Sequence, residues 1–462
     1  MAQSRCRLMG RALAVLMIGL ACARGAEAAA LKAVALQGEA SPVAGASYVK
    51  FAKRGPAIGA NAGERVVFEA VANPPATKGL FAHDPDGSGS LVAQKSGGAP
   101  EGLTFKTFHL GFTNPSIDSS GTVVLAAKLK DGFGEGVYVR KAGDSSLGVV
   151  ARTGDPAAGL PSGSLAEFSH SEPIGLVATT AAAFIATIGN APTVDGLEVR
   201  QVIYACAGGD LDCHSGSGTL TPVVALGDAV DDRPGSEICR ITDLAASIYG
   251  VAFRADVSSD CLTVPAVAGV FRKPLGVFAG SVATLALVGE AAAFPTSTYE
   301  QIRDNVDINN DGAVTFRART RNTTTADQLT SQFICDPATC PAAPAAAAVS
   351  IGDPLPGGNA ITRMETPRTM ISDANDLAFF AKSKGPLGHQ EGVYLRRADG
   401  TIETVAERGD IAPPLHPMDP IAHFSSLSNA VALSDDGRVA FAARILRTSG
   451  PRPLRHGIFA FE

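Results

Sequence analysis

The stretch Asn309-Asn310-Asp311-Gly312-Ala313-Val314-Thr315-Phe316-Arg317-Ala318 combines a tight turn with a short strand that ends in an aromatic and a small residue. Variants of this stretch occur seven times along the chain. Aligned on the position of Phe316, they cover 61–68, 118–125, 177–184, 246–253, 309–316, 372–379 and 434–441. One such unit cannot bury its own apolar face, so neighbouring units must stack against one another.

Two further markers recur in constant order with this stretch. A glycine followed by an acid begins at 38, 154, 227, 289, 352 and 409, and Gly97-Gly98 takes the remaining place. An apolar-aromatic step such as Val137-Tyr138 also occurs in each unit. Each unit contains four short apolar runs separated by Gly, Pro, Asn and Asp, a pattern typical of strands and turns. The sequence therefore predicts an all-β fold, a seven-bladed β-propeller with four-stranded blades.

The repeats define one domain over 29–462, with units at approximately 38–96, 97–153, 154–226, 227–288, 289–351, 352–408 and 409–462. The last unit ends at Glu462 without a fourth strand, whereas residues 31–37 lead directly into Gly38-Glu39 as a fourth strand does elsewhere. We therefore expect residues 31–37 to complete the last blade, which closes the ring and leaves no unpaired edge there.

Residues 1–28 have the pattern of an export signal. Arg5, Arg7 and Arg11 precede an apolar run at 12–21, and Ala26-Glu27-Ala28 resembles a cleavage site. The apolar run is too short to span a bilayer, and the rest of the chain contains no candidate span. Cleavage after Ala28 changes the formal net charge from −6 to −9, which argues against nucleic acid as a partner. The sequence thus predicts a secreted or periplasmic protein, which we expect to be a monomer.

Six cysteines follow the predicted cleavage site, and an even number in an exported chain indicates disulfides. Sequential pairing is the simplest arrangement: Cys206 with Cys213, Cys239 with Cys261, and Cys335 with Cys340. Zinc is the competing interpretation, but the chain has no Cys-x-x-Cys spacing and no cluster of histidines.

The recurring phrase resembles that of the exported bacterial tandem-repeat family named for its NxxGxxAF motif. The resemblance rests on Asn309, Gly312 and Phe316, on Gly437, Ala440 and Phe441, and on the glycine-acid markers, and it extends over the mature chain. It implies a β-propeller-like repeat protein without an established activity. Members often end in a surface-sorting tail, whereas this sequence ends in Phe461-Glu462.

Asp307, Asn309 and Asp311, with Gly312, match the opening of a calcium-binding loop, but Ala318 occupies the position of the bidentate Glu. Because the same register recurs in other units, a structural turn is the favoured interpretation and no metal is predicted. The chain has no Gly-x-Ser-x-Gly elbow, no Walker loop and no dinucleotide fingerprint, so no cofactor is expected and catalytic residues stay unknown.

The segments expected to line the central channel each carry a basic or imidazole side chain: Lys53, His109, His170, Arg240, Arg303, Arg363 and His423. In an acidic protein such groups would form a positive funnel that attracts an anion. The alternative is that these side chains are exposed loop residues or partners of the acids in the glycine-acid markers. The sequence therefore favours a binding or interaction module for a small molecule, glycan or protein, with an anionic ligand as the hypothesis. The alternative is a propeller-fold hydrolase or lyase that acts on a carbohydrate or lactone.

Overall fold

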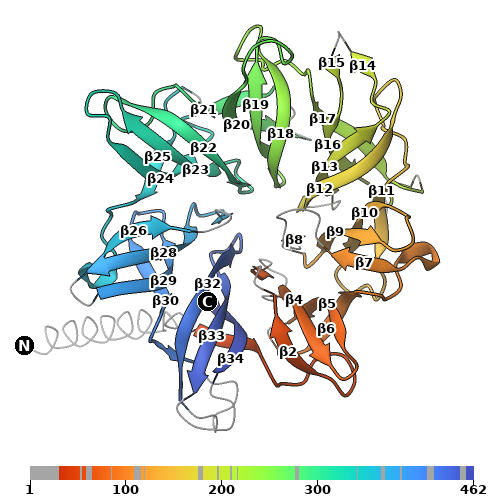
Figure 1. Ribbon diagram of the computed structural model, residues 1–462, viewed down its shortest axis with the longest axis vertical. Helices are drawn as coiled ribbons and strands as arrows, with labels where there is room; N and C mark the ends of the chain where they lie inside the picture. The colour runs from red at the N-terminus through yellow and green to blue at the C-terminus, as the bar shows by residue number, and fades with distance from the viewer. Residues whose placement is uncertain are drawn as a thin grey trace, which may run out of the picture.

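The fold is a ring of seven β-sheets, which is a β-propeller (Figure 1). It is seen in a computed structural model that describes residues 31–52, 55–58, 65–84, 86–108, 116–118, 120–174, 181–194, 197–208, 211–215, 217–275, 280–340, 342–365, 370–385, 388–413, 421–447 and 454–461. The predicted signal peptide lies outside these residues. No helix in the described part of the chain is long and apolar enough to cross a membrane.

The sheets follow one another along the chain, and each strand is antiparallel to its neighbour. Blade 1 comprises β2 (Ser47–Phe51), β3 (Ala57–Ile58), β4 (Val66–Asn73), β5 (Thr77–His83) and β6 (Gly89–Gln94). Blade 2 comprises β7 (Phe105–Phe108), β8 (Ser116–Ile117), β9 (Val123–Leu129), β10 (Glu135–Arg140) and β11 (Gly148–Arg152). Blade 3 comprises β12 (Ser164–Ile174), β13 (Ala181–Gly189), β16 (Gln201–Ala207) and β17 (Thr219–Ala225), with a small ribbon of β14 (Thr193–Val194) and β15 (Leu197–Glu198).

The remaining blades have the same order from the inner to the outer strand. Blade 4 comprises β18 (Glu237–Ala246), β19 (Gly250–Ser258), β20 (Val267–Pro274) and β21 (Ala283–Leu287). Blade 5 comprises β22 (Ser297–Ile308), β23 (Val314–Asn322), β24 (Gln328–Cys335) and β25 (Ala346–Ser350). Blade 6 comprises β26 (Ala360–Met364), β27 (Met370–Ile371), β28 (Leu377–Gly385), β29 (Gly388–Arg396) and β30 (Ile402–Glu407). Blade 7 comprises β31 (Ile411–Ala412), β32 (Ala422–Leu433), β33 (Val439–Arg447), β34 (Leu454–Phe461) and β1 (Leu31–Leu36). Two short 3-10 turns, η1 (Pro100–Gly102) and η3 (Pro356–Gly358), lie between blades.

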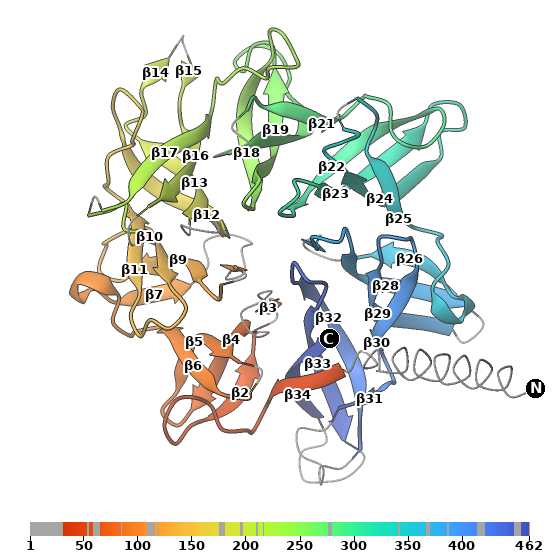
Figure 2. The same ribbon diagram turned by 180° about the vertical axis from the view of Figure 1, so that it is seen from behind.

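The N-terminal strand β1 belongs to the last blade. It pairs with β34 in a register that joins Leu31 to Phe461 and Leu36 to Gly457, and Figure 2 shows this red strand beside the blue β34. This is the pairing that the missing fourth strand of the last repeat predicts. Because strands from both ends of the chain share one sheet, the ring is held closed by backbone hydrogen bonds.

Four blades contain five strands where the sequence predicts four, and in each case the additional strand is a short segment at the inner edge of the sheet. In blades 1, 2 and 6 the inner strand is interrupted, and both of its parts pair with the same second strand, as β2 and β3 do with β4. In blade 7 the short β31 adds to the inner edge of β32. Four strands therefore remain the basic unit of every blade.

The aromatic of the repeated phrase forms the core between blades. Phe68, Phe184, Phe253, Phe316, Phe379 and Phe441 are all buried. Each lies against an aromatic of the third strand of its own blade, as in the stacked pair Phe316 and Phe333, whose ring centroids are 5.5 Å apart. Aromatic pairs combine a large buried area with a specific geometry, which explains why this position recurs.

The turn of the repeated phrase connects the inner strand to the second strand. In blade 5, Asn309 Oδ1 accepts hydrogen bonds from Asp311 N (3.2 Å) and Ala313 N (2.8 Å). Gly312 has φ +83°, and a Cβ placed on it would lie 2.6 Å from the ring of Tyr249 in blade 4. Only glycine satisfies both requirements without strain.

These turns also join neighbouring blades, and we call the set of turns described at 118 and 120–122, 247–250, 309–313, 372–376 and 434–438 the Asx rim. Asn309 Nδ2 donates to Ser372 O (2.9 Å), and Asp373 N donates to Asp435 O (2.9 Å). Asn310 Nδ2 donates to both Asp373 Oδ2 (3.0 Å) and Asp435 Oδ2 (3.1 Å). Side chains and backbone of blades 5, 6 and 7 are thereby interlocked at one end of the ring.

The cysteines form three disulfides: Cys206–Cys213, Cys239–Cys261 and Cys335–Cys340. This confirms the sequential pairing. The bonds lie in blades 3, 4 and 5, and each links positions that are close in the sequence. They restrain loops and strand ends within a blade, and the joins between blades depend on packing and hydrogen bonds.

Candidate functional site

Every inner strand contains a β-bulge near its start, at the end opposite the Asx rim. The register of pairing shifts at Tyr48/Lys50, Phe105/Thr107, Leu165/Glu167, Ile238/Arg240, Tyr299/Gln301, Ile361/Arg363 and Phe424/Ser426. Each bulge places two residues against one on the second strand, so the strand bends and its side chains are re-aimed. Seven equivalent bulges therefore present seven pairs of side chains at equivalent positions around the ring.

Side chains of neighbouring blades hold several bulges in place. Glu135 Oε2 accepts a hydrogen bond from Phe168 N (3.1 Å), and Gln201 Oε1 accepts one from Ile241 N (3.1 Å). Glu391 Oε1 does the same for Leu427 N (3.3 Å). In each case the donor is the first residue after the bulge, and the acceptor lies on the third strand of the preceding blade. The bulges are thus fixed features of the fold.

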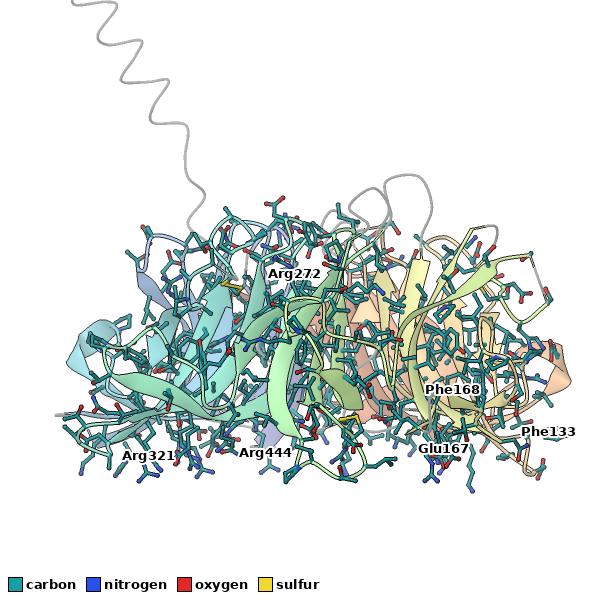
Figure 3. The ribbon with its side chains drawn as sticks, turned by 90° about the horizontal axis from the view of Figure 1, so that it is seen from above. Phe133, Glu167, Phe168, Arg272, Arg321 and Arg444 are labelled. Carbon is teal, nitrogen blue, oxygen red and sulfur yellow. A yellow bond between two sulfur atoms is a disulfide. The ribbon has the colours of Figure 1, made fainter. Side chains whose placement is uncertain are left out.

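The residue at each register shift lies directly opposite a residue of the second strand, and side chains of such a pair share one face of the sheet. We call these seven pairs the bulge ring. They are Lys50 with Val71, Thr107 with Lys128, Glu167 with Thr187, Arg240 with Asp256, Gln301 with Arg319, Arg363 with Lys382, and Ser426 with Arg444. All fourteen residues are exposed or half-buried. Figure 3 shows Arg444 and Glu167 on the face opposite the one toward which Arg272 lies.

Charge is unevenly distributed around the bulge ring. Its two acids, Glu167 and Asp256, lie on blades 3 and 4, whereas five of its cations lie on blades 5, 6, 7 and 1. We call these five, Arg319, Arg363, Lys382, Arg444 and Lys50, the basic arc. A chain with net charge −6 therefore has a concentrated positive region on one face.

A cavity of about 650 Å³ lies within the basic arc, around the inner part of blade 7. We call it the blade 7 cavity. Its walls come from the inner strands β2 and β32 and from β28, β29, β33 and β34. The residues that line it are Gln37, Val49, Lys50, Phe51, Ala52, Glu365, Phe380, Lys382, Glu391, Ser426, Leu427, Ser428, Asn429, Ala442, Ala443, Arg444, His456 and Gly457. This volume suits a small ligand or one or two sugar residues.

Two cations of the cavity, Lys50 and Arg444, differ from its other charged groups in their surroundings. Within the described part of the chain, neither Lys50 nor Arg444 forms an ion pair, and both are exposed. Burial, and then the positive charges of Arg444 and Lys50, lowers the pKa of His456 below its ordinary value. These three side chains are therefore close enough to repel one another, and an anion placed among them would relieve that repulsion.

The two carboxylates of the cavity are already engaged. Glu365 forms ion pairs with Arg363 Nε (2.6 Å) and Lys382 Nζ (3.2 Å). Glu391 accepts the hydrogen bond from Leu427 N that holds the bulge of blade 7. Neither acid compensates Lys50 or Arg444, so the cavity retains an excess of positive charge.

The structure brings only part of the predicted funnel together. Arg240 and Arg363 occupy equivalent positions of the bulge ring. Arg303 follows the bulge of blade 5, and His423 precedes that of blade 7, where its Nδ1 lies 2.9 Å from Gly409 O. Lys53 and His109 are outside the described residues, and the side chain of His170 is likewise not described. Of the four described positions, only Arg240 and Arg363 are equivalent, because Arg303 and His423 lie on either side of the bulges of their blades.

The bulge positions share a sequence signal. In each inner strand two residues stand between two apolar residues, as in Tyr48-Val49-Lys50-Phe51 and Ile361-Thr362-Arg363-Met364. Strict alternation would place only one residue there. This spacing marks the bulge and identifies Lys50 as the residue at the register shift of blade 1. Arg444 and His456 carry no comparable signal, because they lie on the second and third strands.

Two of the three candidate ligands in the calcium-like turn, Asp307 and Asn309, form hydrogen bonds within the protein. Asp307 Oδ2 accepts a hydrogen bond from Ile371 N (2.9 Å). The Asn309 amide donates from Nδ2 to Ser372 O and accepts at Oδ1 from Ala313 N. Among the described residues, no group of three or more His, Cys, Asp or Glu side chains is arranged to hold a metal ion. The turn serves to join blades 5 and 6.

A protein-family model described as a family of unknown function, DUF7453, matches residues 18–205 and 342–462. The chain belongs to DUF7453. The blade 7 cavity lies within the matched ranges, whereas the half-cystines lie at 206–340, outside them. Membership does not confirm the resemblance to the NxxGxxAF repeat family, and it brings no activity to this DUF7453 chain.

No curated protein matches the chain. Solved structures similar to it include the β-propeller domain of the Trilobed protease from Pyrococcus furiosus, with 10% identity, a TM-score of 0.43, and 89% of this chain and 95% of the other covered. An oligogalacturonate lyase in complex with manganese has 10% identity and a TM-score of 0.43 over 94% and 97% of the chains. An α-L-arabinanase of Penicillium chrysogenum complexed with arabinobiose has 13% identity and a TM-score of 0.37 over 79% and 96%. Likenesses this distant carry no argument about activity.

Proposed function

We propose that the protein is an exported binding module that holds an anionic ligand in the blade 7 cavity. The observation that carries the proposal is the pair of unpartnered cations, Lys50 and Arg444, beside His456 in a cavity of about 650 Å³. A cavity lined by charges of one sign attracts ligands of the opposite sign. Three disulfides and the signal-like N-terminus support a secreted or periplasmic location.

Carboxylated sugars fit the remaining lining of the cavity. Ser426, Ser428 and Asn429 offer hydroxyl and amide groups beside the cations. Sugar hydroxyls form hydrogen bonds with such groups, while lysine and arginine bind the carboxylate. We therefore take an acidic oligosaccharide as the probe, and trigalacturonate is a suitable example.

The test compares trigalacturonate binding to the wild type and to the double variant Lys50→Gln/Arg444→Gln by isothermal titration calorimetry. We expect affinity to fall at least about tenfold, or about 1.4 kcal/mol, because both unpartnered charges are lost. Lys95→Gln is the matched control, since it removes an exposed lysine that follows the outer strand of blade 1. Equal affinity of the double variant and the wild type would reject this cavity as the site.

The same samples test the alternative function, a hydrolase or lyase acting on a carbohydrate. Cleavage of trigalacturonate, followed by chromatography of the products, would favour that function. Glu365 and Glu391 are the carboxylates of the cavity that such chemistry would need. Intact trisaccharide after prolonged incubation would support the binding module.

A further inference from the structure

Positive charge extends well beyond the blade 7 cavity, because blades 5 and 6 each carry two cations for one carboxylate. In blade 6, Arg363 and Lys382 share Glu365. In blade 5, Arg319 and Arg321 share Glu300, with N–O distances of 2.8 Å and 3.6 Å. The side chains of Arg363 and Arg321 stay 69% and 53% exposed, so both guanidinium groups can reach a further anion.

Blade 5 carries two more arginines beside this arc. The pairing of β22 with β23 is interrupted between Ile302 and Val306, and the first unpaired residue there is Arg303. Arg317 lies on β23 opposite this interruption. Arg317 Nη1 donates to Met364 O (3.2 Å), but its buried Nε has no hydrogen-bond partner in the described part of the molecule. Burial, and then the charge of Arg303, lowers the pKa of Arg317 to about 10. These arginines are thus a second place where like charges are uncompensated.

The opposite half of the bulge ring, on blades 2, 3 and 4, carries two cations, Lys128 and Arg240, and two acids, Glu167 and Asp256. Lys128 is paired with Glu135, and Arg254 lies 3.4 Å from Asp256. Glu167 adds an exposed negative charge on blade 3. A ligand with several negative charges would therefore be attracted to blades 5, 6, 7 and 1 and repelled from blade 3.

The exposed or half-buried groups between the cations of the arc include neutral polar side chains, whereas the aromatic residues that line the cavity, Phe51 and Phe380, are buried. Gln301, Thr362 and Ser425 belong to the bulges of blades 5, 6 and 7, and all three are exposed or half-buried. Among the described residues the one large exposed aromatic is Phe133, which lies in blade 2. Single-stranded nucleic acids bind through aromatic platforms on which bases stack. Hydroxyl and amide groups between cations instead suit a chain of carboxylated sugars.

We infer that the ligand is a linear acidic polysaccharide that lies along the basic arc. One carboxylated residue occupies the blade 7 cavity, and the following residues pass over blades 6 and 5 toward Arg303. This inference rests on the proposed function and extends it from a short anionic ligand to a polymer. Each further sugar that reaches a cation adds to the affinity without the entropic cost of a separate association.

The experiment measures binding of oligogalacturonates from the trimer to the octamer at two salt concentrations. For the wild type we expect affinity to rise at least about tenfold from trimer to octamer, with a steeper salt dependence for the octamer because more cations are engaged. Equal affinity for trimer and octamer would overturn the inference while leaving the proposed function intact. Absence of trimer binding would reject the proposed function itself.

Variants separate the arc from the cavity. Arg319→Gln/Arg321→Gln, both on blade 5, should retain trimer binding and lose the additional affinity for the octamer, whereas Arg319→Lys/Arg321→Lys should retain both. Lys95→Gln again controls for the loss of an exposed charge, and unchanged melting temperatures show that each variant is folded. A double glutamine variant that binds the octamer like the wild type would overturn the inference. Polyphosphate and single-stranded DNA of matched charge are the competing classes, and tighter binding of either would reject the polysaccharide.

Discussion

The two ends of the inner strands differ in how their residues vary from blade to blade. On the Asx rim, equivalent positions carry Asp118, Asn309, Ser372 and Ser434, which are all buried and accept hydrogen bonds from their own turns. On the bulge ring, equivalent positions carry lysine, threonine, glutamate, arginine, glutamine and serine, and all are accessible to solvent. Residues of one chemical kind in every blade serve the fold, whereas positions that the fold leaves free are those on which a ligand site can be built.

Ring closure supports both ends, so its loss has the largest expected effect. Deletion of residues through Gln37 removes β1 and leaves the edge of β34 unpaired. We expect the melting temperature to fall by more than about 10 °C relative to the chain that starts at residue 29, because a whole strand of the closing blade is lost. Differential scanning calorimetry checks this. Equal melting temperatures of the two chains would show that β1 contributes little to closure.

Exchange of one residue at each end tests the comparison directly. Asn309→Ala removes hydrogen bonds to its own turn and to blade 6 and leaves buried backbone N–H groups without partners. We expect a loss of about 3 kcal/mol of unfolding free energy. Gln301→Ala on the bulge ring should change it by less than about 0.5 kcal/mol, since the side chain is exposed. Urea unfolding of both variants measures the difference, and similar losses would contradict the assignment of structure to one end and function to the other.

The Asx rim also contains an acid whose charge opposes folding. Burial, and then the charge of Asp373, raises the pKa of Asp435 from 3.8 to about 6, with smaller contributions from Asp436 and Asp118. A raised pKa in the folded state means that stability from this group is complete below pH 3.8 and is lost as pH rises through about 6. Asp435→Asn should therefore stabilise the protein by roughly 2 kcal/mol at pH 7 and have little effect near pH 4.

Unfolding of this variant and of the wild type by urea at both pH values provides the measurement. The amide oxygen that the substitution introduces can still accept the hydrogen bond that Asn310 donates to Asp435, so loss of that contact does not confound the result. A variant that is less stable than the wild type at pH 7 would show that the charged carboxylate is needed at the rim.

A smaller effect is expected for the pH dependence of ligand binding at the bulge ring. His456 is flanked by Arg444 and Lys50, and its lowered pKa keeps it neutral at pH 7. When the pH falls below the ordinary pKa range of histidine, protonation of His456 adds a positive charge to the cavity. Trigalacturonate should therefore bind about fivefold more tightly at pH 5 than at pH 7. His456→Gln should abolish most of this dependence without weakening binding at pH 7. If the pH dependence of binding persists in the variant, a group other than His456 must be responsible for it.

The hypothesis from the sequence and the proposed site both involve positive charge, but they differ in most of their residues. A ring of basic side chains on the inner strands was expected, and Arg240 and Arg363 do belong to the bulge ring. Lys50, Arg319, Lys382 and Arg444 were missed because a bulge changes which residues share a face, and because three of them lie on second strands. Their proximity is created by pairing across strands that no local pattern reports.

The sequence by itself determined the seven repeats, the closing strand and the sequential disulfides. Each of these depends on local signals, namely turn residues, alternating apolar positions and short cysteine spacing, that act within one unit. Tertiary structure alone decided where uncompensated charge collects. Lys50 of blade 1 and Arg444 and His456 of blade 7 come from opposite ends of the chain, and only closure of the ring brings them into one cavity. Charge interactions depend on distance in space, which the fold sets and the order of residues does not.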